Sequence, residues 1–191
     1  MPQWSNEPPT APSGYSLRII RTPAATPITA IITSPDLIGC PTHYVKNRTI
    51  PCEGPDNCPH CAEGFSWRWH GYVSAVLTAT LEHVLFECTD HASTSFRCYR
   101  TLHGNLRGCH FRAHRPSKRA NGRVVIECKP TDPQRTPLPD PPDVVRVLCH
   151  IWNIPYTAAS ITRCPRPPFR GLHVEPSKDD GRYTTKQLLD P

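Results

Sequence analysis

The chain has 191 residues, a formal net charge of +6 and a hydrophobic content of 37%, which suffices for one domain of ordinary size with flanking segments. It contains no run of 18 apolar residues and its first residues form no apolar signal segment, so the sequence predicts neither a membrane partner nor secretion. We therefore expect a cytoplasmic protein whose ten cysteines stay reduced and in which clustered cysteines bind metal.

The 24 prolines concentrate at the two ends of the chain and between residues 130 and 142. This distribution predicts a disordered tail at 1–14, a folded domain at 15–130, a proline-rich linker with a C-terminal helix at 131–154, and an extended tail at 155–191. The proline-rich flanks are also candidates for contacts with protein partners.

Aliphatic and β-branched runs predict the first strands at 17–21 and 28–34. A metal-binding loop is expected at 39–64. Alternating side chains predict a long strand at 66–81, and a second short strand follows at 83–88.

The alternation of side chains then stops, and the sequence predicts a helix at 90–102. Asp90 could cap this helix, and Gly104 ends it. Alternation returns at 106–114 and 123–128, where two more strands are expected. Val144, Val147, Leu148 and Ile151 recur at helical spacing, and they predict an amphipathic helix at 143–153.

The order of these elements predicts a mainly β protein of the α+β class. It matches the oligonucleotide/oligosaccharide-binding (OB) fold, a five-stranded antiparallel barrel with a helix between strands three and four, here followed by a C-terminal helix. The metal loop is inserted between the first and second strands of that plan. Another β-barrel remains open as an alternative, because zinc ribbons and SH3-like barrels also use short antiparallel strands.

The strongest chemical motif is a group of three cysteines and one histidine. A C-x2-C pair lets two thiolates grip one ion, and a hairpin turning at residues 47–48 would place residue 43 opposite residue 52. One nitrogen and three sulfurs form a closed tetrahedral set typical of structural Zn²⁺. The predicted zinc ligands are His43, Cys52, Cys58 and Cys61. A set with Cys40 in place of Cys52 stays open, although the hairpin register favours Cys52.

A basic window between residues 97 and 129 holds nine lysines and arginines against one acid, Glu127. Such a window attracts polyanions, and exposed aromatic rings nearby would stack on unpaired bases. We therefore predict a single-stranded nucleic acid, DNA in preference, as the partner. The predicted contacts are Arg68, Trp67, Tyr72, Arg97, Arg100, Arg107, Phe111, Arg112, Arg115, Lys118, Arg119 and Arg123; of these, Trp67, Tyr72 and Phe111 would stack.

The sequence favours a protein that is not an enzyme, because it shows no paired acid and base at a recognisable spacing and no nucleotide-binding glycine loop. Two alternatives remain. One is an adaptor that presents the zinc hairpin and the proline-rich flanks to another protein. The other is a metal-assisted nuclease that uses His91.

The arrangement of His43, Cys52 and the Cys58–Cys61 pair within a predicted OB barrel resembles the single-stranded DNA-binding proteins of T-even phages. In that family a zinc subdomain lies beside an OB fold that coats single strands. Over residues 28–130 the resemblance lies in the order of the ligands and elements and not in an alignable sequence, since the ligand spacings differ. It implies structural zinc and single-strand binding as expectations. Those phage proteins end in an acidic tail that recruits partners, whereas residues 178–190 are mixed in charge, so recruitment by that route is not implied.

Overall fold

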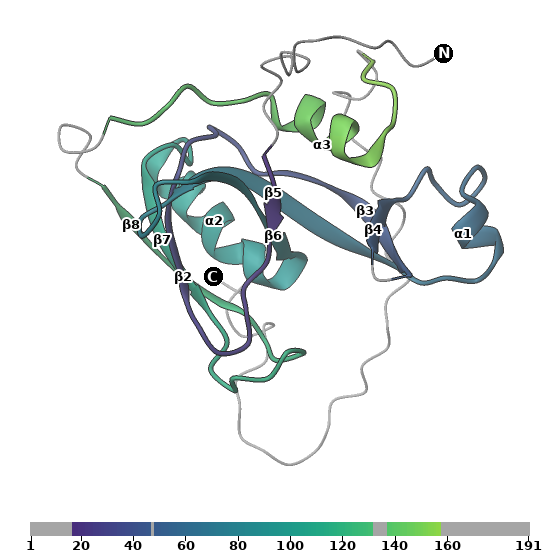
Figure 1. Ribbon diagram of the computed structural model, residues 1–191, viewed down its shortest axis with the longest axis horizontal. Coiled ribbons are helices and arrows are strands. Elements are labelled where there is room, and N and C mark those ends of the chain that lie inside the picture. The colour runs from purple at the N-terminus through teal and green to yellow at the C-terminus, as the bar shows by residue number, and fades with distance from the viewer. Residues whose placement is uncertain (1–16, 47, 132–136, 158–191) are drawn as a thin grey trace, which may run out of the picture.

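The structure is a computed structural model that describes residues 17–46, 48–131 and 137–157 (Figure 1). The predicted tail at 1–14, part of the predicted linker (132–136) and most of the predicted C-terminal tail (158–191) lie outside the described residues. The elements are β1 (Ile19–Ile20), β2 (Ile28–Ile32), β3 (Ile38–Val45), β4 (Arg48–Pro51), α1 (Pro59–Ala62), β5 (Trp67–Leu77), β6 (His83–Thr89), α2 (Asp90–His103), β7 (Cys109–His114), β8 (Val125–Pro130) and α3 (Val144–Trp152).

In the described residues, eight strands form one mixed, open sheet in the order β1-β6-β5-β2-β7-β8, with β3 on β5 and β4 on β3. Every pair is antiparallel except β1 with β6. The prediction of a mainly β, α+β protein is confirmed. A closed five-stranded barrel is not seen, because β1 occupies the free edge of β6 and no pairing joins β6 to β8 within the described part of the chain.

The main core lies between one face of this sheet and α2. Alternation along β5 directs Val73 and Ala75 to that face, and Phe96 of α2 meets Phe86 and Phe111 at ring-centroid distances of 6.2 and 5.2 Å. Rings at these separations add favourable edge-to-face contacts to their apolar burial. Phe96 thus anchors α2 on this face of the sheet.

The two ends of α2 follow capping chemistry, with one correction to the prediction. The cap residue is Thr89, whose side chain accepts a hydrogen bond from the N–H of Ala92, whereas Asp90 lies in the first turn and pairs with Arg97. A carboxylate there is favoured by the helix dipole. Gly104 ends the helix at φ 82°, as predicted.

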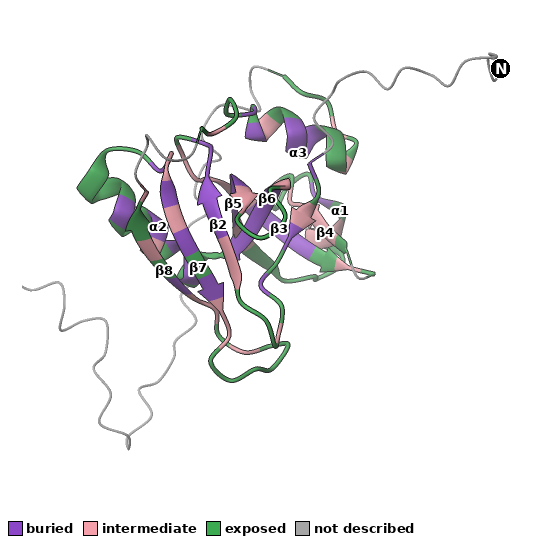
Figure 2. Ribbon diagram, turned by 60° about the vertical axis from the view of Figure 1, so that its left-hand side comes forward, coloured by how far each residue is buried: buried purple, intermediate pink, exposed green. Residues whose placement is uncertain are grey.

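The opposite face of β5 and β6 carries a second apolar cluster, which α3 covers. Tyr72 and Leu85, whose parity points them away from the main core, pack with Val144, Val147 and Leu148 of α3. This helix carries both buried and exposed residues (Figure 2). Ile151, predicted to share the apolar stripe, is 40% exposed.

Strands β3 and β4, helix α1 and the first half of β5 extend to one side of the sheet, with α1 near the tip (Figure 1). We call residues 38–72 the arm. Near its base the indole of Trp69 lies against Gly39 and Gly71, which are paired across β3 and β5. The guanidinium of Arg97 stands over the same ring, 5.0 Å from its centroid. The indole therefore links the arm to α2.

We expect Gly71→Ala to destabilise the domain, because the new Cβ would lie 2.5 Å from the Trp69 ring. Overpacking of this kind costs about 1–3 kcal/mol, and denaturant unfolding followed by circular dichroism measures it. In a Trp69→Leu background the ring is gone, so the same substitution should cost less than about 1 kcal/mol. Equal costs in the two backgrounds would show that the indole is not what requires glycine there.

Candidate metal centre

The arm brings four potential metal ligands into one group. His43 comes from β3, Cys52 directly follows β4, and Cys58 and Cys61 flank the start of α1. Their ligand atoms all lie within 4.8 Å of one another. The Nε2 atom of His43 is 3.4 Å from each of the Cys58 and Cys61 sulfurs, and the Cys52 and Cys61 sulfurs are 3.5 Å apart. A tetrahedral ion with ordinary bond lengths requires edges of about 3.6–3.8 Å, so these four side chains could hold a metal ion.

The hairpin reaches this arrangement in a register that differs from the predicted one. His43 is opposite Ile50 instead of Cys52, because the turn lies one residue earlier than predicted, between Val45 and Arg48, and includes Lys46 at φ 47°; this moves the partner of His43 by two residues. The N–H of Cys52 donates to the carbonyl of Pro41 at 2.9 Å, which continues the ladder. A shift of two residues preserves the face to which each side chain points. Cys52 and His43 therefore share a face although they are not directly opposed.

The orientation of His43 suits a ligand. Its side chain is buried, and its Nδ1 lies 3.2 Å from the carbonyl oxygen of Ser66. When Nδ1–H donates to that carbonyl, the lone pair of Nε2 faces the sulfurs. Such a bond from the distal ring nitrogen to a carbonyl is typical of metal-binding histidines. Sequence reasoning missed Ser66, since a backbone acceptor leaves no trace in residue type.

The pKa of the Cys58 thiol is lower than that of an ordinary cysteine. Burial alone would raise its pKa, but backbone N–H groups of Glu53, Cys61 and His60 point at the sulfur and lower the pKa to about 6. Burial and the neighbouring thiol of Cys52 raise the pKa of Cys61 to about 12. Metals bind thiolates, so Cys58 offers the first charged sulfur, and a cation would have to displace the proton of Cys61.

The alternative ligand Cys40 points to the other face of the arm. It pairs with His70 on β5 and packs against the cluster beneath α3. His60, between the two knuckle cysteines, places its ring edge-on to His43 and Phe65 at 5.7 and 5.9 Å. The structure thus groups Cys52, not Cys40, with the other ligands.

Several of the arginines predicted to contact nucleic acid form ion pairs with carboxylates. Three arginines form ion pairs: Arg97 with Asp90 at 2.6 Å, Arg100 with Asp36 at 2.8 Å, and Arg112 with Glu127 at 3.8 Å. All six side chains are about half exposed. Exposed pairs of this kind contribute only about 0–1 kcal/mol each, so the guanidinium groups remain able to exchange a carboxylate for a phosphate.

Two other arginines are structural in this fold. Arg107 donates to the carbonyls of Thr33, Leu138 and Pro139 at 2.8–3.1 Å, which ties the proline-rich segment to the end of β2. Arg115 donates to the carbonyl oxygens of Thr22 and Gly122. These hydrogen bonds give both side chains a structural role, and their contact with phosphates stays a prediction.

The connection between β7 and β8, residues 115–124, presents three exposed cations. Lys118, Arg119 and Arg123 are exposed there, and no hydrogen bond or ion pair within the described residues engages their side chains. The connection itself contains no acidic residue. We call these three side chains the loop cations.

The predicted aromatic contacts divide into buried and exposed rings. Tyr72 and Phe111 are fully buried, Tyr72 under α3 and Phe111 in the main core. Neither offers a ring face to a base in this structure, and their role in stacking stays a prediction. Trp67 is 38% exposed, and Arg68 is exposed on the opposite face of β5. Two further rings, Tyr44 and Phe65, are exposed.

A scan against protein-family models and searches of curated proteins and solved structures found no match for this chain. Among the described residues, no helix is long and apolar enough to cross a membrane. His91, the residue of the nuclease alternative, is exposed in the first turn of α2 and is not part of the four-ligand group. The candidate metal centre therefore consists of His43, Cys52, Cys58 and Cys61, and these four side chains determine what it can bind.

Proposed function

We propose that this protein is a non-enzymatic, zinc-stabilised, OB-like protein of the cytoplasm that binds single-stranded nucleic acid, with DNA as the preferred strand. The loop cations carry this proposal. Three exposed cations within six residues, with no acid in the connection that holds them, form a local positive field suited to phosphates.

The donor set supports zinc as the ion. Three thiolates and one imidazole are soft and borderline ligands that suit tetrahedral Zn²⁺ and disfavour Mg²⁺ or Ca²⁺. Four protein ligands leave no open position for water or substrate, so the ion would be structural. Its role would be to hold the tip of the arm, because α1 contains no buried residue of its own.

The strand order supports the OB interpretation. Counting β2 as the first strand, the path β6-β5-β2-β7-β8 is three-two-one-four-five, and α2 connects the third strand to the fourth. In OB folds the face of strands two and three, together with the connections one–two and four–five, binds oligonucleotides. Here the arm forms the first of these connections and residues 115–124 form the second.

Binding to a labelled oligothymidylate across a salt series tests the function. If the three loop cations each neutralise one phosphate, the log–log slope of affinity against salt should be about −2 or steeper, since single strands give about −0.7 per contact. Fluorescence anisotropy measures the slope, with a duplex of equal length as the control ligand. Affinity independent of salt, or a duplex bound as tightly as the single strand, would contradict the proposal.

The exposed rings of the arm favour a second candidate, a protein-interaction adaptor. Tyr44, Phe65 and Trp67 are 60%, 43% and 38% exposed, and aromatic side chains are enriched at protein interfaces. A pull-down that recovers one protein after nuclease treatment, and loses it in Phe65→Ala, would support the adaptor. The same treatment should abolish recovery if nucleic acid bridges the two proteins.

A further inference from the structure

Helix α3 lies on the face of β5 and β6 that the OB interpretation assigns to the ligand, so any role of this helix in binding depends on the proposed function. Val147 and Leu148 of α3 pack on Tyr72 of β5 and Leu85 of β6. Trp152 stands edge-on to Tyr72 with the ring centroids 5.7 Å apart. A ligand for this face would have to take the place of the helix.

The contact of α3 with the sheet is separable from the main core. Its side chains belong to a cluster distinct from the one that α2 covers. The helix has nine residues, and isolated helices shorter than about 12–15 residues are marginal in water. Once detached from the sheet, α3 would therefore not remain a folded helix.

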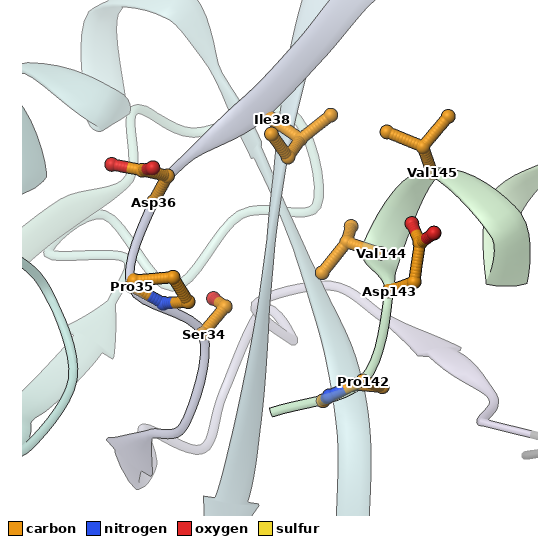
Figure 3. A pocket seen from close by; sticks show the side chains of 8 residues that line it. All are labelled: Ser34, Pro35, Asp36, Ile38, Pro142, Asp143, Val144 and Val145. Atoms are coloured by element: carbon orange, nitrogen blue, oxygen red, sulfur yellow. The ribbon is translucent and has the colours of Figure 1, made fainter. Parts of the chain in front are cut away.

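The seam between α3 and the sheet is incompletely filled. A cavity of about 250 Å³ lies between the β2–β3 connection and the first turn of α3, with Pro35 and Ile38 on one side and Pro142 and Val144 on the other (Figure 3). This pocket is partly open to solvent, so the side chains that line it lack packing partners on that side. The helix is therefore held less tightly at this end than a core helix would be.

The polar groups beneath α3 do not depend on the helix for their hydrogen bonds. The hydroxyl of Tyr72 donates to Glu87 at 3.3 Å, and Glu87 is also held by Arg21 at 2.6 Å. These bonds do not involve α3, so its departure would leave neither group without a partner. It would uncover an aromatic ring on the same face as Arg21 and Arg68, the combination that single-strand sites use.

We propose that α3 is a displaceable cover on the nucleic-acid face of β5 and β6, and that single strands and α3 compete for this face. Arg107, which holds the carbonyls of Leu138 and Pro139, keeps the helix tethered when it leaves. Apparent affinity is the intrinsic affinity multiplied by the fraction of molecules that are uncovered. Weakening the cover should therefore tighten binding.

The test compares Leu148→Asp, which places a charge in the buried contact, with Ile151→Asp, which places the same charge at an exposed position of the same helix. Leu148→Asp should bind a labelled oligothymidylate at least about fivefold more tightly than the wild type, and Ile151→Asp should stay within about twofold. Hydrogen exchange of the β5 amides checks that both variants remain folded.

Three outcomes separate the two proposals. If the wild type binds and the folded Leu148→Asp variant binds no more tightly, the cover is wrong and the proposed function stands. If none of the three proteins binds at low salt, both fail. In the wild type, hydrogen exchange of α3 amides should also accelerate when the oligonucleotide is added, and unchanged or slower exchange there would overturn the cover independently of any variant.

Discussion

Cys58→Ser, or removal of the ion by a chelator, is expected to unfold the tip of the arm while the sheet and α2 stay folded. The tip has little else to hold it, since α1 has four residues and none of them is buried. In small zinc sites the binding free energy, about 10–16 kcal/mol, is folding free energy. Amide spectra of the protein should lose the dispersed signals of residues 52–66 and keep those of β5 to β8.

The control is Cys98→Ser, which removes an exposed thiol on α2 and should leave both the arm and the metal content unchanged. Chelation should reproduce the effect of Cys58→Ser in the wild type, and added Zn²⁺ should reverse it only there. An arm that keeps its dispersed signals without metal would mean that packing alone positions the four side chains.

The triple variant Lys118→Glu, Arg119→Glu and Arg123→Glu should lose most of its affinity for single strands. Three lost phosphate contacts remove roughly 2 from the salt slope, which corresponds to a loss of a few hundredfold at about 50 mM salt and about tenfold at about 300 mM. The loop is exposed, so stability should change by less than about 0.5 kcal/mol. Anisotropy titrations at the two salt concentrations measure the loss of affinity and the extent to which this loss decreases at the higher salt concentration.

The matched control keeps the charge and changes only the side chain: Lys118→Arg, Arg119→Lys and Arg123→Lys. It should bind within about threefold of the wild type, because the counterion term depends on charge. If the charge-reversed protein binds as well as this control, the loop cations are not the phosphate contacts. The ion-paired Arg97, Arg100 and Arg112 would then be the next candidates.

Outside the predicted metal loop, which contains β3, β4 and α1, the order and type of the elements were predictable because hydrophobic period and turn residues are local signals. The alternation in residues 66–81 and the helical spacing of Val144, Val147 and Leu148 each correspond to an element. The grouping of the four candidate metal ligands was predictable for a different reason. An error of two residues in the hairpin register leaves the face of every side chain unchanged, so a wrong register still placed Cys52 in the group that could hold a metal ion.

The roles of individual arginines and aromatics were not predictable, because their partners are distant in sequence. Arg115 is engaged by the carbonyl of Thr22, and Tyr72 is buried by a helix more than seventy residues further along the chain. Alternation shows which side chains share a face but not what covers that face. The pair Gly39 and Gly71 likewise became meaningful only when the register placed both against Trp69.

Mapping amide shifts of the zinc-loaded protein while a short oligothymidylate is added at low salt tests the account most directly. Saturable shifts confined to residues 115–124, to the arm, to the face of β5 and β6 and to α3 are the predicted result. Saturation with shifts only at the tip of the arm, or no shift at millimolar oligonucleotide, would contradict it.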